Sequence, residues 1–207
     1  MSESRRFQFR GLGAALSNLL LATLFISFAY AHLQRFLAHP RPSLLLIVVV
    51  EGLVAVMLVI RRDPENTQHG WKTWLATSIG TFAPMLLRPT DAPTDLLIGQ
   101  VLQVAAVLLQ IGAVLSLNRS FGLLPAHRGV KSDGMYRWVR HPLYSTYLLA
   151  HVGYLASNMS VPNFLVILTV TVFQVVRILQ EEALLLQYPD YARYSSSTRW
   201  RLVPAVW

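Results

Sequence analysis

The sequence contains no cysteine, and charged residues of either sign are few. Without a thiol the chain cannot form disulfides, bind zinc through thiolates or use a cysteine nucleophile. Only 14% of its 207 residues are charged, against about 25% in a typical soluble domain, whereas 54% are hydrophobic and the mean hydropathy is +0.44. The charges are missing from long stretches and crowded into short ones, a distribution typical of an integral membrane protein.

The few charges that are present are mostly basic. Lysine and arginine number 18 against 10 acidic residues, for a formal net charge of +8. Such a charge could indicate nucleic-acid binding, but basic residues that flank apolar stretches orient membrane proteins and contact anionic lipid head groups. We therefore expect a lipid bilayer as the partner and no nucleic acid.

Five charge-poor stretches predict six membrane-spanning helices, which makes the fold an all-α, polytopic transmembrane bundle. The last stretch is charge-free for 36 residues, too long for one helix across a hydrocarbon core of about 30 Å. Asn158 and Pro162 predict the break within it. The third stretch is the shortest, so five spans is the alternative. The stretches are Gly11–Gln34, Ser43–Ile60, Thr73–Leu87, Leu96–Asn118 and His141–Val176.

The basic residues also predict the orientation of the bundle. With six spans and the N-terminus in the cytosol, 15 of the 18 basic residues fall on the cytosolic side, and Arg35, Arg41 and Arg88 on the other. The positive-inside rule therefore places both termini in the cytosol. The polar segments Asn118–Arg140 and Arg177–Trp207 then face the same compartment.

The loop that follows the fourth predicted span is rich in basic, aromatic and glycine residues. Gly129 and Gly134 permit positive φ angles and close approach of a ligand to the backbone. Pro142 is expected at the start of a helix, where its missing N–H costs nothing. A helix N-terminus beside Arg140 and His141 attracts anions. The alternative is a basic connector that only contacts lipid head groups.

A second polar segment follows the last predicted span. Arg177 and Glu181 are four residues apart and share a helix face. Ionisable groups at the edge of a span are costly unless they pair or serve a site, and the alternative is a surface ion pair that contributes only tenths of a kcal/mol. The adjacent Glu182 points about 100° away, which leaves at least one carboxylate for another role. The tail beyond, with Tyr188, Tyr191 and several arginines, is typical of an amphipathic segment folded against the membrane surface.

Taken together, these motifs resemble the isoprenylcysteine carboxyl methyltransferase family, whose wider group includes phospholipid methyltransferases. The resemblance covers about residues 115 to 207. Four pieces occur in order at matching spacing. They are Gly134-Met-Tyr-Arg-Trp-Val-Arg-His-Pro-Leu-Tyr144, Arg177-x-x-x-Glu181-Glu182, Tyr191-x-x-Tyr194 and Arg201-Leu-Val-Pro204.

The resemblance implies an integral membrane methyltransferase that binds S-adenosylmethionine at the cytosolic membrane face, without a metal. It implies that Arg140 and Arg177 are catalytic, with Arg177 steering an anionic acceptor. The acceptor itself, a lipophilic or small carboxylate, amine or thiol, stays open. The implied cofactor-binding residues are Val130, Gly134, Tyr136, His141, Pro142, Tyr144, Glu181, Glu182 and Tyr191.

The same resemblance suggests how the chain is organised. We expect residues 1–118 to form N-terminal transmembrane helices and residues 119–207 a catalytic part, integrated into one domain. The expected location is a bacterial cytoplasmic membrane, which the chain crosses several times. Glu51 and His151 lie within predicted spans, and we expect each to be hydrogen-bonded between helices rather than functional.

Two other functions are compatible with the sequence. An NAD(P)H-dependent membrane reductase of the steroid or sterol type carries a similar Arg-His-Pro-x-Tyr stretch, although a chain of 207 residues has little room for a dinucleotide. A non-catalytic membrane protein, such as a small transporter, would explain intramembrane polar residues such as Glu51 and His151.

Overall fold

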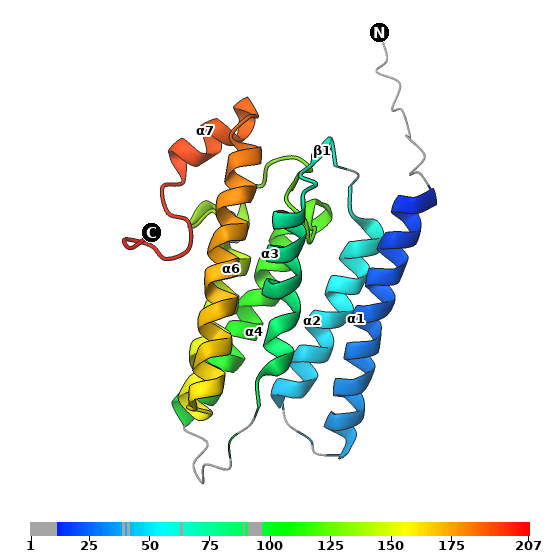
Figure 1. The fold of residues 1–207 in the computed structure, drawn as a ribbon, viewed down its shortest axis with the longest axis vertical. Helices are drawn as coiled ribbons and strands as arrows, with labels where there is room; N and C mark the ends of the chain where they lie inside the picture. The colour runs from blue at the N-terminus through cyan, green and yellow to red at the C-terminus, as the bar shows by residue number, and fades with distance from the viewer. Residues whose placement is uncertain (1–11, 39, 41, 63, 89, 91–96) are drawn as a thin grey trace.

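The computed structural model describes residues 12–38, 40, 42–62, 64–88, 90 and 97–207. Within them the regular secondary structure is helical apart from one pair of two-residue strands. Long helices lie side by side, and the short helix α7 lies across one end of the bundle (Figure 1). The all-α prediction is therefore confirmed. The predicted span limits Gly11 and Leu96, and the basic residues Arg5, Arg6, Arg10 and Arg41, lie outside the described residues.

Six of the seven α-helices of the described chain coincide with the six predicted spans. The helices are α1 (Leu12–Ala38), α2 (Pro42–Ile60), α3 (Trp71–Phe82), α4 (Leu97–Leu117), α5 (Pro142–Ser157), α6 (Val161–Leu185) and α7 (Pro189–Ser197). Proline opens α5 as predicted, and α5 and α6 are separated by a short turn at the predicted break. In that turn Ser160 caps α6 by accepting a hydrogen bond from the backbone N–H of Asn163 at 3.3 Å.

Three described helical segments are long and apolar enough to cross a membrane: Ala15–Ala38, Leu97–Ser120 and Val161–Leu185. These segments indicate a multi-pass integral membrane protein. Leu45–Ile60 is apolar but shorter. The 12 residues of α3 correspond to about 18 Å of helix, and the 3₁₀ turn Ala83–Leu86 extends it beyond Phe82. The number of spans therefore stays a prediction.

The helices pack as two groups that meet at α4. Helix α1 packs along α2, and α2 contacts α4. On the other side α5 packs along α4, and α3 packs against α6. Close approach of α4 and α5 depends on small residues, because a Cβ on Gly99 would lie 2.1 Å from the Ser157 hydroxyl oxygen.

The loops at the α7 end of the bundle are joined by backbone pairing. The strands β1 (Asn66–Thr67) and β2 (Ala126–His127) pair antiparallel, with Asn66 opposite His127. The short 3₁₀ helices Asn118–Ser120 and Gly134–Arg137 lie in the connection from α4 to α5. This connection, β1, α7 and the start of α1 lie at the same end of the molecule (Figure 1).

Candidate active site

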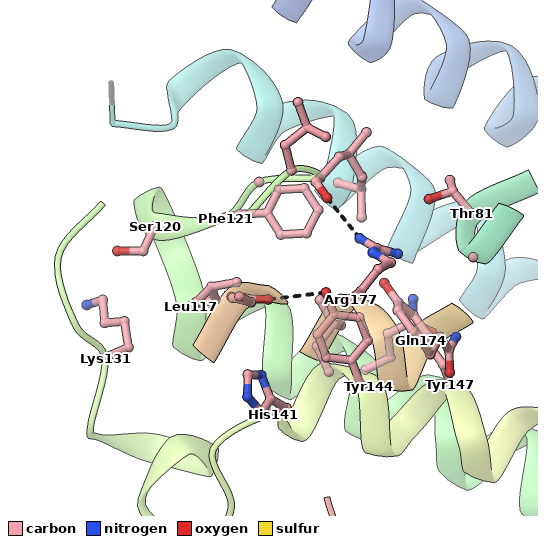
Figure 2. Close-up of a pocket in the computed structure, with 18 of the residues that line it drawn as sticks. Thr81, Leu117, Ser120, Phe121, Lys131, His141, Tyr144, Tyr147, Gln174 and Arg177 are labelled. Carbon is pink, nitrogen blue, oxygen red and sulfur yellow. Dashed lines mark hydrogen bonds between the residues drawn. The ribbon is translucent and has the colours of Figure 1, made fainter. Parts of the chain in front are cut away.

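A cavity of about 390 Å³ lies where the α4–α5 connection meets α6 and α7. Its wall also includes residues of α1, α2 and α3, so it draws on most of the chain. Figure 2 shows His141, Tyr144 and Arg177 around it, opposite Phe121. Eight of the eleven predicted site residues line the cavity: Val130, Tyr136, Arg140, His141, Tyr144, Arg177, Glu181 and Tyr191.

The α7 side of the cavity is formed by a tyrosine cluster, Tyr136, Tyr191 and Tyr194. The Tyr194 hydroxyl donates to the backbone oxygen of Tyr136 at 2.6 Å and thereby ties α7 to the α4–α5 connection. The rings of Tyr191 and Tyr194 meet edge to face at 5.6 Å. Burial raises the pKa of all three phenols, so they remain neutral hydrogen-bond donors. The cluster offers an apolar, aromatic surface to a ligand.

Glu182 lies behind the cavity wall and organises it. Its side chain is 3% exposed, and its carboxylate accepts hydrogen bonds from Nε of Arg201 at 2.7 Å and from Nε2 of His141 at 3.2 Å. Arg140 forms an ion pair with the same carboxylate at 3.2 Å. Two positively charged arginines and a histidine therefore share one buried acid, which fixes Arg140 and His141 in the cavity wall.

Backbone hydrogen bonds hold the C-terminal tail against Arg140 and His141. The N–H of Arg140 donates to the carbonyl of Trp200 at 2.8 Å, and the N–H of His141 donates to that of Arg201 at 2.9 Å. Arg201 thus contacts His141 through its backbone carbonyl and Glu182 through its side chain. The tail was expected at the membrane surface, and its role as a support of the site was missed.

Glu181, unlike Glu182, faces the cavity. The Tyr144 hydroxyl donates to its carboxylate at 3.3 Å. Arg177 does not pair with it among the described residues, so the surface ion pair considered from the spacing is not formed. The Arg177 side chain instead donates from Nη2 to the carbonyl of Leu123 at 2.9 Å and lies 5.3 Å from the centre of the Tyr144 ring. It is buried, with 5% exposed, and lines the cavity.

Three predicted site residues are not in the cavity wall that the described residues form: Gly134, Pro142 and Glu182. Gly134 has φ = 57°, and a Cβ there would lie 2.6 Å from the Ser116 hydroxyl oxygen. Gly129 has φ = 85°. Both glycines therefore adopt the positive φ that their lack of a side chain permits. Gly134 and Pro142 shape the connection and the start of α5 from outside the cavity wall, whereas Gly129 lines the cavity.

Several cavity residues were not found from the sequence. Lys131 and Phe121 belong to the connection, and Tyr147 lies one turn after Tyr144 on α5. Gln174 lies one turn before Arg177 on α6. The helical spacing from a motif residue could have identified Tyr147 and Gln174, because residues three or four apart share a helix face. The contributions of α1 to α3, such as Phe25 and Thr81, carry no such signal.

A further contact joins β2 to the start of α7. The His127 ring stacks on Tyr188 with ring centres 3.8 Å apart. Its Nδ1 lies 2.8 Å from Glu65, and its Nε2 lies 3.4 Å from Asp190. Because α7 carries two members of the tyrosine cluster, this contact helps to position them.

The two polar residues expected between helices differ in their surroundings. Glu51 of α2 is bonded to Nδ1 of His32 of α1 at 2.9 Å, as expected. His151 of α5 is 8% exposed and lines the cavity, yet its Nδ1 has no hydrogen-bond partner among the described residues. The expectation is confirmed for Glu51, whereas for His151 the bond to another helix is not found at this atom.

Comparison with known proteins supports the motif resemblance. Residues 93–187 match the model of the isoprenylcysteine carboxyl methyltransferase (ICMT) family, a segment that contains α4, the connection, α5 and α6. The resemblance to this family is thereby confirmed over a little less than half of the 207 residues. No curated protein matches the sequence. The matched segment holds the motif regions 134–144 and 177–182, whereas the two tail motifs lie beyond it.

Proposed function

We propose that this protein is an integral membrane methyltransferase that uses S-adenosylmethionine and acts on a lipophilic or small anionic acceptor. One observation carries the proposal: the α4–α5 connection and the end of α6, which hold the family motifs, line a single cavity. Its volume of about 390 Å³ is in the range usual for small-molecule sites.

The groups around the cavity suit the parts of this cofactor. A carboxylate, Glu181, is available for the ammonium of its amino-acid moiety. Arg140 and His141 offer positive charge and N–H donors for its carboxylate. The tyrosine cluster offers a slot for adenine, and the Tyr144 ring offers a face that tolerates a sulfonium cation. The residues present therefore fit the cofactor.

When bound, the cofactor would supply an electrophilic methyl group, and the protein's main task would be alignment. Glu182 would act as a positioning residue, because it fixes Arg140 and His141 without lining the cavity. Tyr144 would be held by its bond to Glu181 and by the guanidinium of Arg177. These contacts restrict the groups next to the reacting atoms before any substrate enters.

The surroundings of Arg177 support the proposal that the methyl acceptor is anionic. It is a buried cation in the cavity wall, and no carboxylate of the described residues lies within ion-pair distance of it. Its Nε is also without a hydrogen-bond partner in that part of the chain. A buried, unpaired charge is costly, and an acceptor carboxylate would relieve that cost. Methylation of a carboxylate also needs no general base.

For the arrangement in the membrane we propose that the α7 end of the bundle faces the cytosol, where the cofactor is available. The positive-inside distribution of the basic residues supports this orientation. We further propose that residues 119–207 form the catalytic part of one integrated domain, with residues 1–118 as its transmembrane support. Cavity residues from α1, α2 and α3 are consistent with such integration.

Binding of S-adenosylhomocysteine to purified protein in nanodiscs tests the cofactor assignment. We expect saturable binding that falls at least tenfold in Glu181→Gln and in His141→Ala, because each removes a charge-assisted contact. Asp133→Asn is the matched control, since Asp133 is exposed on the same connection and does not line the cavity. Stabilisation by NADPH but not by S-adenosylhomocysteine in a thermal-shift assay would overturn the proposal in favour of a reductase.

A further inference from the structure

The transmembrane helices form one part of the cavity wall, and α1, α2 and α4 contribute mainly apolar residues to it. Phe25, Val50, Val54 and Val107 line it from α1, α2 and α4. A purely hydrocarbon ligand would suit these residues. Against this background each polar side chain in the wall requires a partner, because an unbonded polar group inside a membrane protein is costly.

Polar residues in this part of the wall differ in whether the protein satisfies them. Glu51 is bonded to His32 at 2.9 Å, so the protein itself provides its partner. His151 is only 8% exposed, and its Nδ1 has no hydrogen-bond partner among the described residues. Gln174, 4% exposed, lies in the same cavity wall. An unsatisfied buried group of this kind costs about 1–3 kcal/mol.

The position of His151 on α5 indicates how far apart two polar groups of a bound molecule would have to be. His151 follows Tyr144 by seven residues on α5, which corresponds to about 10 Å along the helix axis. Tyr144 is the residue whose ring the Arg177 guanidinium contacts. A molecule with its anionic group beside Arg177 and Tyr144 would therefore reach His151 with a second group about two helical turns farther along α5.

We propose that the His151 imidazole hydrogen-bonds a second polar group of the acceptor, such as a hydroxyl, in the part of the cavity that the transmembrane helices line. The inference rests on the proposed function and narrows its substrate class. The acceptor is then a compact molecule with an anionic group at one end and a hydrogen-bonding group at the other. An acceptor with a plain hydrocarbon tail leaves His151 unsatisfied and binds more weakly.

Two matched probes test this proposal: octanoic acid and 8-hydroxyoctanoic acid, each titrated into the protein in nanodiscs without any cofactor. We expect the wild type to bind the hydroxy acid about tenfold more tightly, the effect of one net hydrogen bond. His151→Leu should bind the two probes equally, and His151→Gln should restore part of the preference. Val152→Leu is the control, since Val152 is the next residue on α5, is exposed and does not line this cavity.

Thermal unfolding of the ligand-free variants separates a binding role from a structural one. If His151 has no partner in the free protein, His151→Leu should melt at the same temperature as the wild type or higher. A melting temperature several degrees lower would show that His151 is bonded within the fold and would overturn the proposal. Equal affinity of the wild type for both probes, binding of neither probe, or an unchanged preference in His151→Leu would also overturn it.

Failure of this inference can be told from failure of the proposed function. S-adenosylhomocysteine is titrated separately into the wild type and into His151→Leu, with equal binding expected for both. Normal binding of that compound without discrimination between the probes would overturn only the role of His151. Discrimination between the probes without binding of that compound would overturn only the assignment of the cofactor.

Discussion

Glu182 and Arg201 are joined by a hydrogen bond of 2.7 Å that links the end of α6 to the C-terminal tail. The same carboxylate holds Arg140 and His141. One buried acid thus connects three segments that are far apart in sequence. A cavity wall built in this way depends on a residue that does not itself line the cavity.

Substitutions of this pair should have unequal effects. Glu182→Gln removes the charge that Arg140 and Arg201 share, and loss of one partner of a buried ion pair costs about 3–5 kcal/mol. Arg201→Ala leaves Glu182 with its other two partners and should cost about 1.5–3 kcal/mol, the range for a hydrogen bond to a charged group. Chemical unfolding of both single variants and of the double variant measures this. Additive losses would contradict a shared network.

The Tyr194 hydroxyl offers a test of how α7 is attached. Tyr194→Phe removes the buried 2.6 Å bond to the Tyr136 carbonyl, and we expect it to lower stability by about 1 kcal/mol. S-adenosylhomocysteine should bind more weakly, since Tyr194 and Tyr136 both line the cavity. Tyr30→Phe is the control, because Tyr30 is exposed on α1. Unchanged stability of Tyr194→Phe would show that α7 is held by other contacts.

The tyrosine cluster also predicts a dependence of stability on alkaline pH. Burial raises the pKa of Tyr136, Tyr191 and Tyr194 in the folded protein, whereas tyrosine in the unfolded chain has a pKa of about 10. The folded state then holds its protons more tightly. Stability is unaffected below about pH 10 and falls above it, by about 1.4 kcal/mol per pH unit for each phenol. Unfolding between pH 8 and 11 should show a shallower fall in Tyr194→Phe.

Local sequence rules were sufficient for the helices and for several turns. Charge-poor stretches located six of the helices, and Pro142, Asn158 and Pro162 located helix starts and the break, because each acts through its own backbone. The positive φ of Gly129 and Gly134 could be anticipated in the same way. Most of the site residues that were predicted from the motif segments lie in the wall of one cavity.

Contacts between segments could not be obtained from these rules. Spacing suggested that Arg177 pairs with Glu181, but the side chain reaches the carbonyl of Leu123, 54 residues earlier, because tertiary packing places that carbonyl beside it. The roles of the two glutamates differ for the same reason: Glu182 meets Arg201 of the tail, and Glu181 is left to face the cavity. Helices α1 to α3 enter the cavity wall without any motif.

Gly134 tests the shape of the connection. Gly134→Ala combines a positive φ of 57° with a Cβ 2.6 Å from the Ser116 hydroxyl oxygen, so we expect a loss of about 1–3 kcal/mol and weaker S-adenosylhomocysteine binding. Ser116→Ala in the same chain removes the hydroxyl contact, leaves the Cβ of residue 116 at 3.1 Å, and does not change the backbone strain, so it should restore stability in part. Thermal unfolding of the single and double variants distinguishes the two causes. Complete rescue by Ser116→Ala would exclude the contribution from φ.

Gly80 of α3 tests the position of Arg177. A Cβ at Gly80 would lie 3.3 Å from both Cδ and Nη1 of Arg177, so Gly80→Ala must displace that side chain by a few tenths of an ångström. We expect stability to change by less than about 1 kcal/mol, since alanine favours the helix, but the KM for an anionic acceptor to rise several-fold. S-adenosylhomocysteine should bind normally, because Glu181, Arg140 and His141 are not affected.

Gly52→Ala on α2 is the matched control, since a Cβ there meets nothing within 4 Å. It makes the same chemical change in another apolar helix, so it separates the displacement of Arg177 from the general effect of alanine on a helix. The KM for the acceptor should stay at the wild-type value in this control. A rise in KM in both variants, or in neither, would show that Arg177 does not set the affinity for the acceptor, and the anionic class of substrate would then lose its support.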